Sequence, residues 1–155
     1  MESYKLFFDG ASKGNPGAAG AGAVLIAPDG STTNCNQSLG VATNNVAEYK
    51  ALILGLEAAI AEDVRHIEVF GDSLLVVSQV SGQWKCRDAN LETLRDKALA
   101  LSLNFEQFKI SHIPRGQNAQ ADQQANIGVN RGSVHTVFIN GAPYAPPLSV
   151  TPHFA

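Results

Sequence analysis

The sequence contains little cysteine, and this shortage excludes several classes of protein. Its 155 residues include only two cysteines, Cys35 and Cys86, which are too far apart for the Cys-x-x-Cys spacing of zinc and redox sites. A disulfide-rich secreted scaffold is therefore excluded. Two cysteines in a chain of this length indicate buried free thiols in a reducing compartment, so we expect a cytoplasmic protein. A single disulfide between the two is the alternative.

Long hydrophobic runs are also missing. The longest weakly polar stretch, residues 17–27, consists mostly of Gly and Ala, and a membrane-spanning helix needs about 20 apolar residues. The first residues lack the basic region and the apolar core of a secretory signal. We therefore expect neither a signal peptide nor an association with membranes.

The sequence has few charged residues and no excess of basic ones. Charged residues make up 16% of the chain and the net charge is −3, whereas nucleic-acid-binding proteins normally carry a basic surface. If the carboxylates of Asp9, Glu48, Asp72 and Asp122 held divalent cations, the net charge of the remainder would be +1. Binding of a nucleic acid would then depend on local basic clusters.

The pattern of apolar residues predicts one α/β domain of mixed architecture. The length and the hydrophobic fraction of 45% fit a single globular domain. Three runs bounded by Gly, Pro and Asn predict an antiparallel meander of strands at residues 5–9, 20–27 and 31–39. Strands and helices then follow in mixed order: helix 45–62, strand 66–70, helix 74–80, helix 90–103, strand 105–113 and helix 118–129. This order predicts a mixed sheet with helices on its faces.

The C-terminal part of the chain has a different composition. Beyond Asn130 the sequence is rich in Gly and Pro, which predicts an extended tail over residues 131–155 after a catalytic domain of residues 1–130. Residues 134–140 could add an edge strand to the sheet. We expect a monomer, with self-association through the tail as the alternative.

Four acidic residues stand where predicted elements begin or end: Asp9, Glu48, Asp72 and Asp122. Taken singly, each has a structural explanation, because Asp-Gly is a common turn, Asn45 and Glu48 have capping-box spacing, and acids stabilise helix starts. Taken together, they provide the oxygen ligands that hard divalent cations such as Mg²⁺ require. If the strands before Asp9 and Asp72 are parallel neighbours, both carboxylates lie at the same end of the sheet.

Four segments resemble the type 1 ribonuclease H family and occur in the family's order: FDGASKGNPG at 8–17, TNNVAEYKAL at 43–52, GDSLLVVSQVSGQW at 71–84 and IPRGQNAQAD at 113–122. The resemblance covers about residues 4–129, and four long motifs in order are highly specific. It implies a ribonuclease H-like fold whose five-stranded mixed sheet has the strand order 3-2-1-4-5. It also implies an endonuclease that hydrolyses the RNA strand of RNA–DNA hybrids by a two-metal-ion mechanism, leaving 5′-phosphate and 3′-hydroxyl ends.

The resemblance also implies roles for individual residues. Asp9 and Asp72 would bind two Mg²⁺ ions most directly, with Mn²⁺ as the alternative metal, and Glu48 and Asp122 would complete the site. The minor groove of the hybrid, where the 2′-hydroxyl distinguishes RNA from DNA, would be contacted by Gly10, Asn15, Asn44 and Asn45. Trp84 and Lys85 would contact the DNA strand. The alternative for Trp84 is packing in the core.

The chain departs from the family pattern at three places. The loop before Asp122 contains no His, so Arg115 is the candidate for the phosphate-facing position there, and we expect His112 to be a structural residue of its strand. The link between residues 82 and 90 is too short for the basic protrusion of the bacterial enzymes. Gln123 and Gln124 replace an apolar position, so we expect the last helix to dock loosely.

Two other functions remain as alternatives to the nuclease. A catalytically weak nucleic-acid-binding module could have the same fold, although all four carboxylates are retained. A nucleotide-binding protein is less favoured, because the stretch from Gly10 to Gly17 lacks the Gly-Lys-Ser/Thr ending of a phosphate-binding loop.

Overall fold

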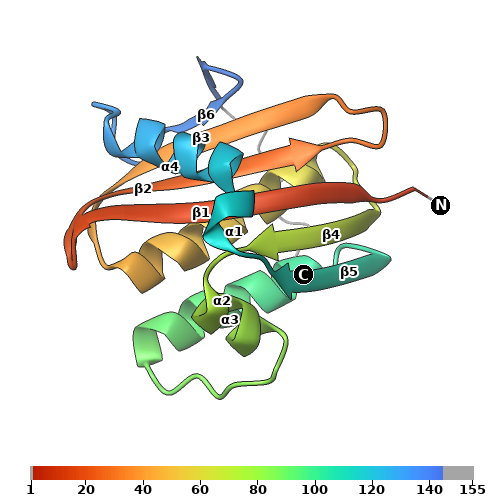
Figure 1. Cartoon of the computed structure of the whole chain (residues 1–155), viewed down its shortest axis with the longest axis horizontal. Coiled ribbons are helices and arrows are strands. Elements are labelled where there is room, and N and C mark those ends of the chain that lie inside the picture. The colour runs from red at the N-terminus through yellow and green to blue at the C-terminus, as the bar shows by residue number, and fades with distance from the viewer. Residues whose placement is uncertain (1, 145–155) are drawn as a thin grey trace.

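The computed structural model describes residues 2–144, which form one mixed β-sheet covered by helices on both faces (Figure 1). Strands β1 (Tyr4–Gly14), β2 (Gly17–Ile26) and β3 (Thr32–Ala42) make the antiparallel meander. Strand β4 (His66–Gly71) pairs parallel with β1, and β5 (Gln107–His112) pairs parallel with β4. Two further strands, β6 (Val137–Ile139) and β7 (Ala142–Pro143), extend the sheet beyond β3.

The helices lie close to the predicted positions: α1 (Asn44–Ala61), α2 (Leu74–Val80), α3 (Ala89–Ser102) and α4 (Ala119–Val129), with a short 3-10 helix, η1 (Arg115–Gln117), before α4. Side chains immediately before the first three helices accept hydrogen bonds from their first turns, and these caps are Thr43, Ser73 and Asp88. Such N-caps satisfy backbone N–H groups that have no partner within the helix, which explains where these helices begin.

The predicted sheet is confirmed, and among the described residues it has seven strands where five were expected. The observed order is β5-β4-β1-β2-β3-β6-β7, which contains the predicted order 3-2-1-4-5 read from the other side. The edge strand predicted at residues 134–140 is observed as β6, which pairs antiparallel with β3. The first part of the predicted tail thus joins the sheet, and residues 145–155 lie outside the described residues.

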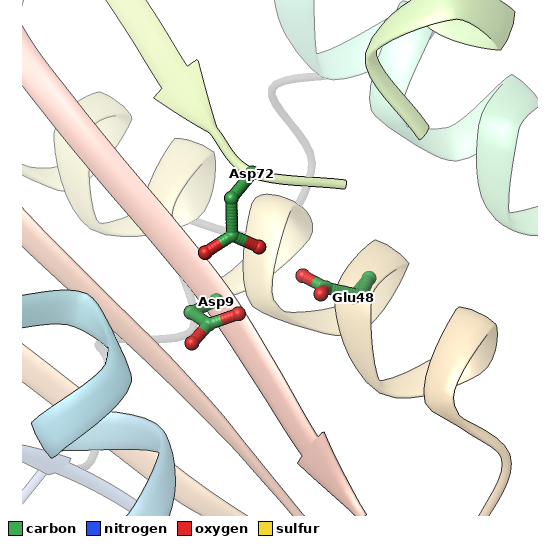
Figure 2. A group of neighbouring side chains, drawn as sticks. All are labelled: Asp9, Glu48 and Asp72. Carbon is green, nitrogen blue, oxygen red and sulfur yellow. The ribbon is translucent and has the colours of Figure 1, made fainter. Parts of the chain in front are cut away.

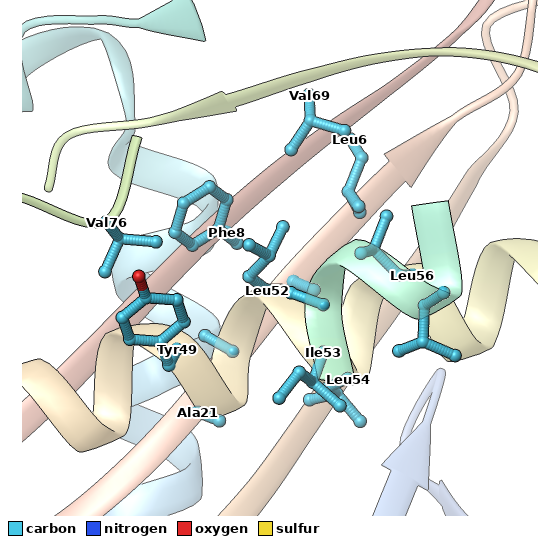
Figure 3. Packing of buried hydrophobic residues seen from close by; sticks show 14 of the residues in the cluster. Leu6, Phe8, Ala21, Tyr49, Leu52, Ile53, Leu54, Leu56, Val69 and Val76 are labelled. Atoms are coloured by element: carbon cyan, nitrogen blue, oxygen red, sulfur yellow. The ribbon is translucent and has the colours of Figure 1, made fainter. Parts of the chain in front are cut away.

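One face of the sheet packs against α1 through large apolar side chains (Figure 3). Leu6 and Phe8 of β1 are fully buried, as are Tyr49, Leu52 and Leu56 of α1. Side chains alternate between the two faces of a strand. Leu6 and Phe8 therefore share this face, while the side chain of Asp9 leaves β1 on the opposite face. The core therefore holds α1 next to β1 at the point where Asp9 follows Phe8.

The other face packs against α4 through residues that have almost no side chain. A Cβ atom added to Gly20 or Gly22 of β2 would overlap the backbone of α4, and one added to Gly128 would overlap the backbone of β3. The helix also contributes the fully buried Ala121 and Ala125. The expectation that α4 docks loosely was therefore wrong, because glycine and alanine let its backbone approach the sheet directly.

The environment of the two cysteines agrees with the sequence prediction. Cys35 and Cys86 are both buried and free. Burial raises the pKa of the Cys35 thiol to about 12, so this thiol stays protonated and unreactive at neutral pH. Among residues 2–144, no helix combines the length and apolar character needed to cross a membrane.

Candidate metal and nucleic-acid site

Asp9 and Asp72 come from two parallel strands that lie side by side. Phe8 of β1 is in register with Gly71 of β4, so the next residue along each strand reaches the same end of the sheet. A Cβ atom at Gly71 would overlap the ring of Phe8, so glycine is needed for this close packing. The result is that the two carboxylates face each other across neighbouring strands (Figure 2).

Glu48 reaches the same place from α1. Its Oε1 accepts a hydrogen bond from the backbone N–H of Gly10 at 3.0 Å, and a Cβ atom at Gly10 would overlap the backbone of Ala47 and Glu48. Thr43 caps the helix, so the capping-box explanation of Glu48 was wrong. One carboxylate oxygen from each of Asp9, Glu48 and Asp72 lies within 4.8 Å of the other two.

Asp122 joins the group from the first turn of α4. Its carboxyl group lies near that of Asp9 and contributes to the raised pKa of Asp9, and its backbone N–H donates to the carbonyl oxygen of Asn118 at 3.0 Å. All four acids line one open cleft of about 600 Å³. The other polar side chains and the glycine that line this cleft are Gly10, Ser12, Lys13, Asn44, Asn45, Ser73, Arg115 and Asn126.

The carboxylates repel one another strongly. Burial, followed by the charge of Asp72, raises the pKa of Asp9 to about 7. Burial, followed by the charges of Asp9 and Asp72, raises the pKa of Glu48 to about 9. Anions held this closely are stabilised by a cation, and an all-oxygen donor set suits Mg²⁺, Mn²⁺ or Ca²⁺ better than softer metals. The residues present therefore fit a hard divalent cation.

Asn118 is a site residue to which the sequence motifs assigned no role. Its side chain is 1% exposed, and its Nδ2 donates to the carbonyl oxygen of Phe8 at 2.9 Å and to Oδ2 of Asp72 at 3.2 Å. One amide thus links β1, the end of β4 and the start of α4. Its signals in the sequence were its place in the motif at residues 113–122 and its position four residues before Asp122, and neither reveals these contacts.

The predicted substrate-binding residues fall into two groups. Gly10, Asn44, Asn45 and Arg115 line the cleft with the acids. Asn15 lies next to this group, because its Oδ1 accepts a hydrogen bond from the backbone N–H of Asn44 at 3.0 Å.

Trp84 and Lys85 belong to the second group, which does not line the cleft. Both follow α2 in the loop that leads to α3. Trp84 is 47% exposed, so its alternative assignment to the core was wrong. His112 is an exposed residue at the end of β5 and also lies outside the cleft lining.

Comparison with known proteins supports a family assignment. A family model described as reverse transcriptase-like matches residues 7–128. Ribonuclease HI of Halobacterium salinarum is 46% identical over 121 residues, and the match covers 77% of this chain and 61% of that relative. The chain therefore matches less than two thirds of this relative's length.

Solved structures agree with the sequence comparison. The crystal structure of RNase H1 from Halobacterium salinarum has a TM-score of 0.80 and 42% identity, covering 83% of this chain and 98% of that one. LC11-RNase H1, solved in complex with an RNA/DNA hybrid, has a TM-score of 0.76 and 34% identity, covering 83% of this chain and 97% of that one. The likeness in both cases extends over nearly the whole of the solved chain.

Proposed function

The chain belongs to the type 1 ribonuclease H family, and from this premise we propose that it hydrolyses the RNA strand of RNA–DNA hybrids as a metal-dependent endonuclease. The observation that carries the proposal is the convergence of Asp9, Glu48 and Asp72, whose carboxylate oxygens lie within 4.8 Å of one another. Three buried or half-buried acids are costly for stability unless a cation compensates them. The expected products have 5′-phosphate and 3′-hydroxyl ends.

The four acids would hold two Mg²⁺ ions, with Mn²⁺ as the alternative. Asp9 and Asp72 would bind them most directly, and Glu48 and Asp122 would complete the set. Bound ions of this kind stabilise charge on a phosphate and lower the pKa of the attacking water. Asp9 and Glu48 must lose their protons before they act as ligands, so cation affinity increases with pH.

The rim of the cleft would bind the nucleic acid. Asn44 and Asn45, at the start of α1, present amide groups that can recognise a 2′-hydroxyl, which both donates and accepts hydrogen bonds. Gly10 and Asn15 would support the same groove contact. Arg115, which also lines the cleft, supplies a cation suited to a phosphate.

Trp84 and Lys85 would contact the DNA strand of the hybrid. An exposed aromatic ring next to a lysine suits a sugar and its phosphate. Because these two residues lie outside the cleft lining, their contribution would be to affinity rather than to the chemical step.

We place the protein in the cytoplasm and expect it to act as a monomer, with association through the C-terminal tail as the alternative. The two free, buried thiols support a reducing compartment. We also keep residues 1–130 as the catalytic domain and residues 131–155 as a C-terminal extension.

Incubation with an RNA–DNA hybrid labelled on the RNA strand tests the proposal. Cleavage is expected with Mg²⁺ or Mn²⁺ and is expected to stop with EDTA, and analysis of the fragments should show 5′-phosphate ends. A DNA duplex of the same sequence is the negative control. Binding of the hybrid without metal-dependent cleavage would reject the nuclease and support the catalytically weak binding module instead.

A further inference from the structure

Asn126 lines the cleft although none of the family-like motifs includes it. It lies in α4, four residues after Asp122, and residues four apart lie on the same face of a helix. It therefore extends the cleft-facing side of α4 beyond the acid by about one turn, since four residues span about 6 Å along the helix axis. This spacing is on the scale of one nucleotide step.

A local hydrogen bond holds the Asn126 side chain in place. Its Nδ2 donates to the carbonyl oxygen of Asp122 at 2.9 Å, which uses one of its two N–H groups. Its second N–H and its Oδ1 form no hydrogen bond to any residue in the range 2–144. A donor and an acceptor are thus left free on a side chain that lines the cleft.

The position of Asn126 completes a pattern of neutral amides around the acids. Asn44 and Asn45 lie on the α1 side of the cleft and Asn126 lies on the α4 side. An amide adds no negative charge to the acid cluster, so it does not repel a phosphodiester strand. Asn is also a poor helix former, so its presence within α4 calls for a compensating role.

We propose that Asn126 is a substrate-binding residue that hydrogen-bonds a sugar 2′-hydroxyl of the RNA strand, one nucleotide from the phosphate that is cleaved. A 2′-hydroxyl both donates and accepts, so it matches the free donor and acceptor of Asn126, whereas a phosphate oxygen only accepts. This inference rests on the proposed function, because it assumes that the strand passing the acids is RNA.

Asn130 provides a matched control one turn further along the chain. Its Nδ2 donates to the carbonyl oxygen of Asn126 at 3.1 Å, so it makes the same type of bond to the residue four positions earlier. Asn130 is exposed and does not line the cleft. Asn126→Ala and Asn130→Ala therefore each remove one local hydrogen bond of the same type, and only Asn126→Ala also removes an amide from the cleft.

The first measurement is hybrid binding by fluorescence anisotropy in EDTA, where a metal-dependent enzyme leaves the substrate intact. We expect Asn126→Ala to weaken binding about threefold to tenfold, the range for one hydrogen bond, and Asn130→Ala to bind like the wild type. Thermal unfolding of both variants checks that they fold. Equal affinity of the three proteins would overturn the proposal.

The second measurement identifies the contacted group. Hybrids with a single 2′-deoxy substitution at successive RNA positions should each be compared on the wild type and on Asn126→Ala. At one RNA position, the 2′-deoxy substitution should weaken binding to the wild type but should not weaken binding to Asn126→Ala. If every 2′-deoxy penalty persists in Asn126→Ala, the 2′-hydroxyl assignment is refuted.

Cleavage by the wild type with Mg²⁺ separates this inference from the proposed function. Wild-type cleavage together with unchanged binding by Asn126→Ala would reject the role of Asn126 and leave the nuclease intact. Absence of wild-type cleavage would reject the nuclease, while the 2′-deoxy series in EDTA would still decide whether Asn126 contacts RNA. A loss of Mn²⁺ affinity without a change in hybrid binding would make Asn126 a metal ligand and overturn the substrate contact.

Discussion

The two faces of the sheet pack in different ways. The α1 face uses large side chains such as Phe8, Tyr49 and Leu52, which interlock around β1 (Figure 3). The α4 face uses the glycines of β2 and the alanines of α4, so that backbone lies against backbone. Packing by large side chains can adjust to a small change in volume, whereas contact between two backbones leaves no atom free to move aside.

The candidate site depends on both kinds of packing. Glu48 is held by the α1 face and Asp122 by the α4 face, while Asp9 and Asp72 belong to the sheet itself. The α4 side adds polar contacts from two buried amides, because Asn118 bonds Asp72, and Asn36 donates to Oε1 of Gln124 at 2.9 Å. The acids therefore keep their mutual geometry only while both helices stay docked.

The largest expected effect is on the cleavage rate, and it distinguishes Asp72, which follows β4 of the sheet, from Asp122 of α4. Asp72→Asn should lower the single-turnover cleavage rate about a thousandfold or more, because a direct cation ligand contributes several kcal/mol to the reaction. Asp122→Asn should lower it about tenfold to a hundredfold. Both variants should unfold at the wild-type temperature or higher, because carboxylate repulsion is reduced. Full activity of Asp72→Asn would refute its role as a ligand.

A second comparison tests the packing of the two faces directly. Gly22→Ala, on the α4 face, should lower the free energy of unfolding by about 3 kcal/mol, the upper end for overpacking, because the new Cβ would meet the α4 backbone. Leu52→Met, on the α1 face, should cost less than about 1.5 kcal/mol. Urea denaturation measures both.

The control for this comparison is Gly132→Ala. A Cβ atom at Gly132 meets no atom within 4 Å, so this variant should be as stable as the wild type or slightly more stable. If Gly22→Ala destabilised no more than Leu52→Met, the distinction between the two faces would fail.

A third comparison tests whether two buried amides near α4, those of Asn118 and Asn36, have different roles. Asn118→Ala and Asn36→Ala each remove a buried amide and leave its partners without that hydrogen bond, so each should cost about 1–3 kcal/mol of stability. Only Asn118 contacts the acid cluster. Asn118→Ala should therefore also weaken Mn²⁺ binding about tenfold, measured by titration calorimetry. Equal Mn²⁺ affinity in the two variants would show that Asn118 only docks the helix.

The last comparison concerns pH. The pKa of Asp9 is raised to about 7 and that of Glu48 to about 9 in the folded, metal-free protein. The folded state then binds more protons than the unfolded state, so stability should fall as pH rises from about 4 towards 9. In EDTA the melting temperature should decline over this range, and Asp9→Asn should reduce the slope. A melting temperature that rises from pH 5 to pH 8 in EDTA would contradict these shifts.

The order of strands and helices could be predicted because it depends on local patterns. The period of apolar residues located the helices, and the turn at residues 28–30 located the β2–β3 hairpin. The ends of strands were less predictable, since β1 continues to Gly14 through residues expected to form a turn. There, pairing with β2 overrides the local preference of Asp9-Gly10 for a turn.

The site could be predicted only in part. The four acids were identified from the sequence, whereas the amides of Asn118 and Asn126 were not assigned. The tight docking of α4 was missed because Gln123 and Gln124 were taken as polar residues in an apolar position. The glycines of β2 that allow the close approach lie about 100 residues earlier in the chain, and no local pattern connects the two segments.

Motifs and periodicity are properties of neighbouring residues, so they were enough to predict the family, the element order and the identity of the acids. Tertiary structure alone decided that Glu48 bonds Gly10 rather than capping its helix, that Asn118 bonds Asp72, and that α4 lies directly on β2. These contacts join residues that are 38 and 46 positions apart or more. Their geometry follows from strand register and helix docking, which arise only when the whole chain packs together.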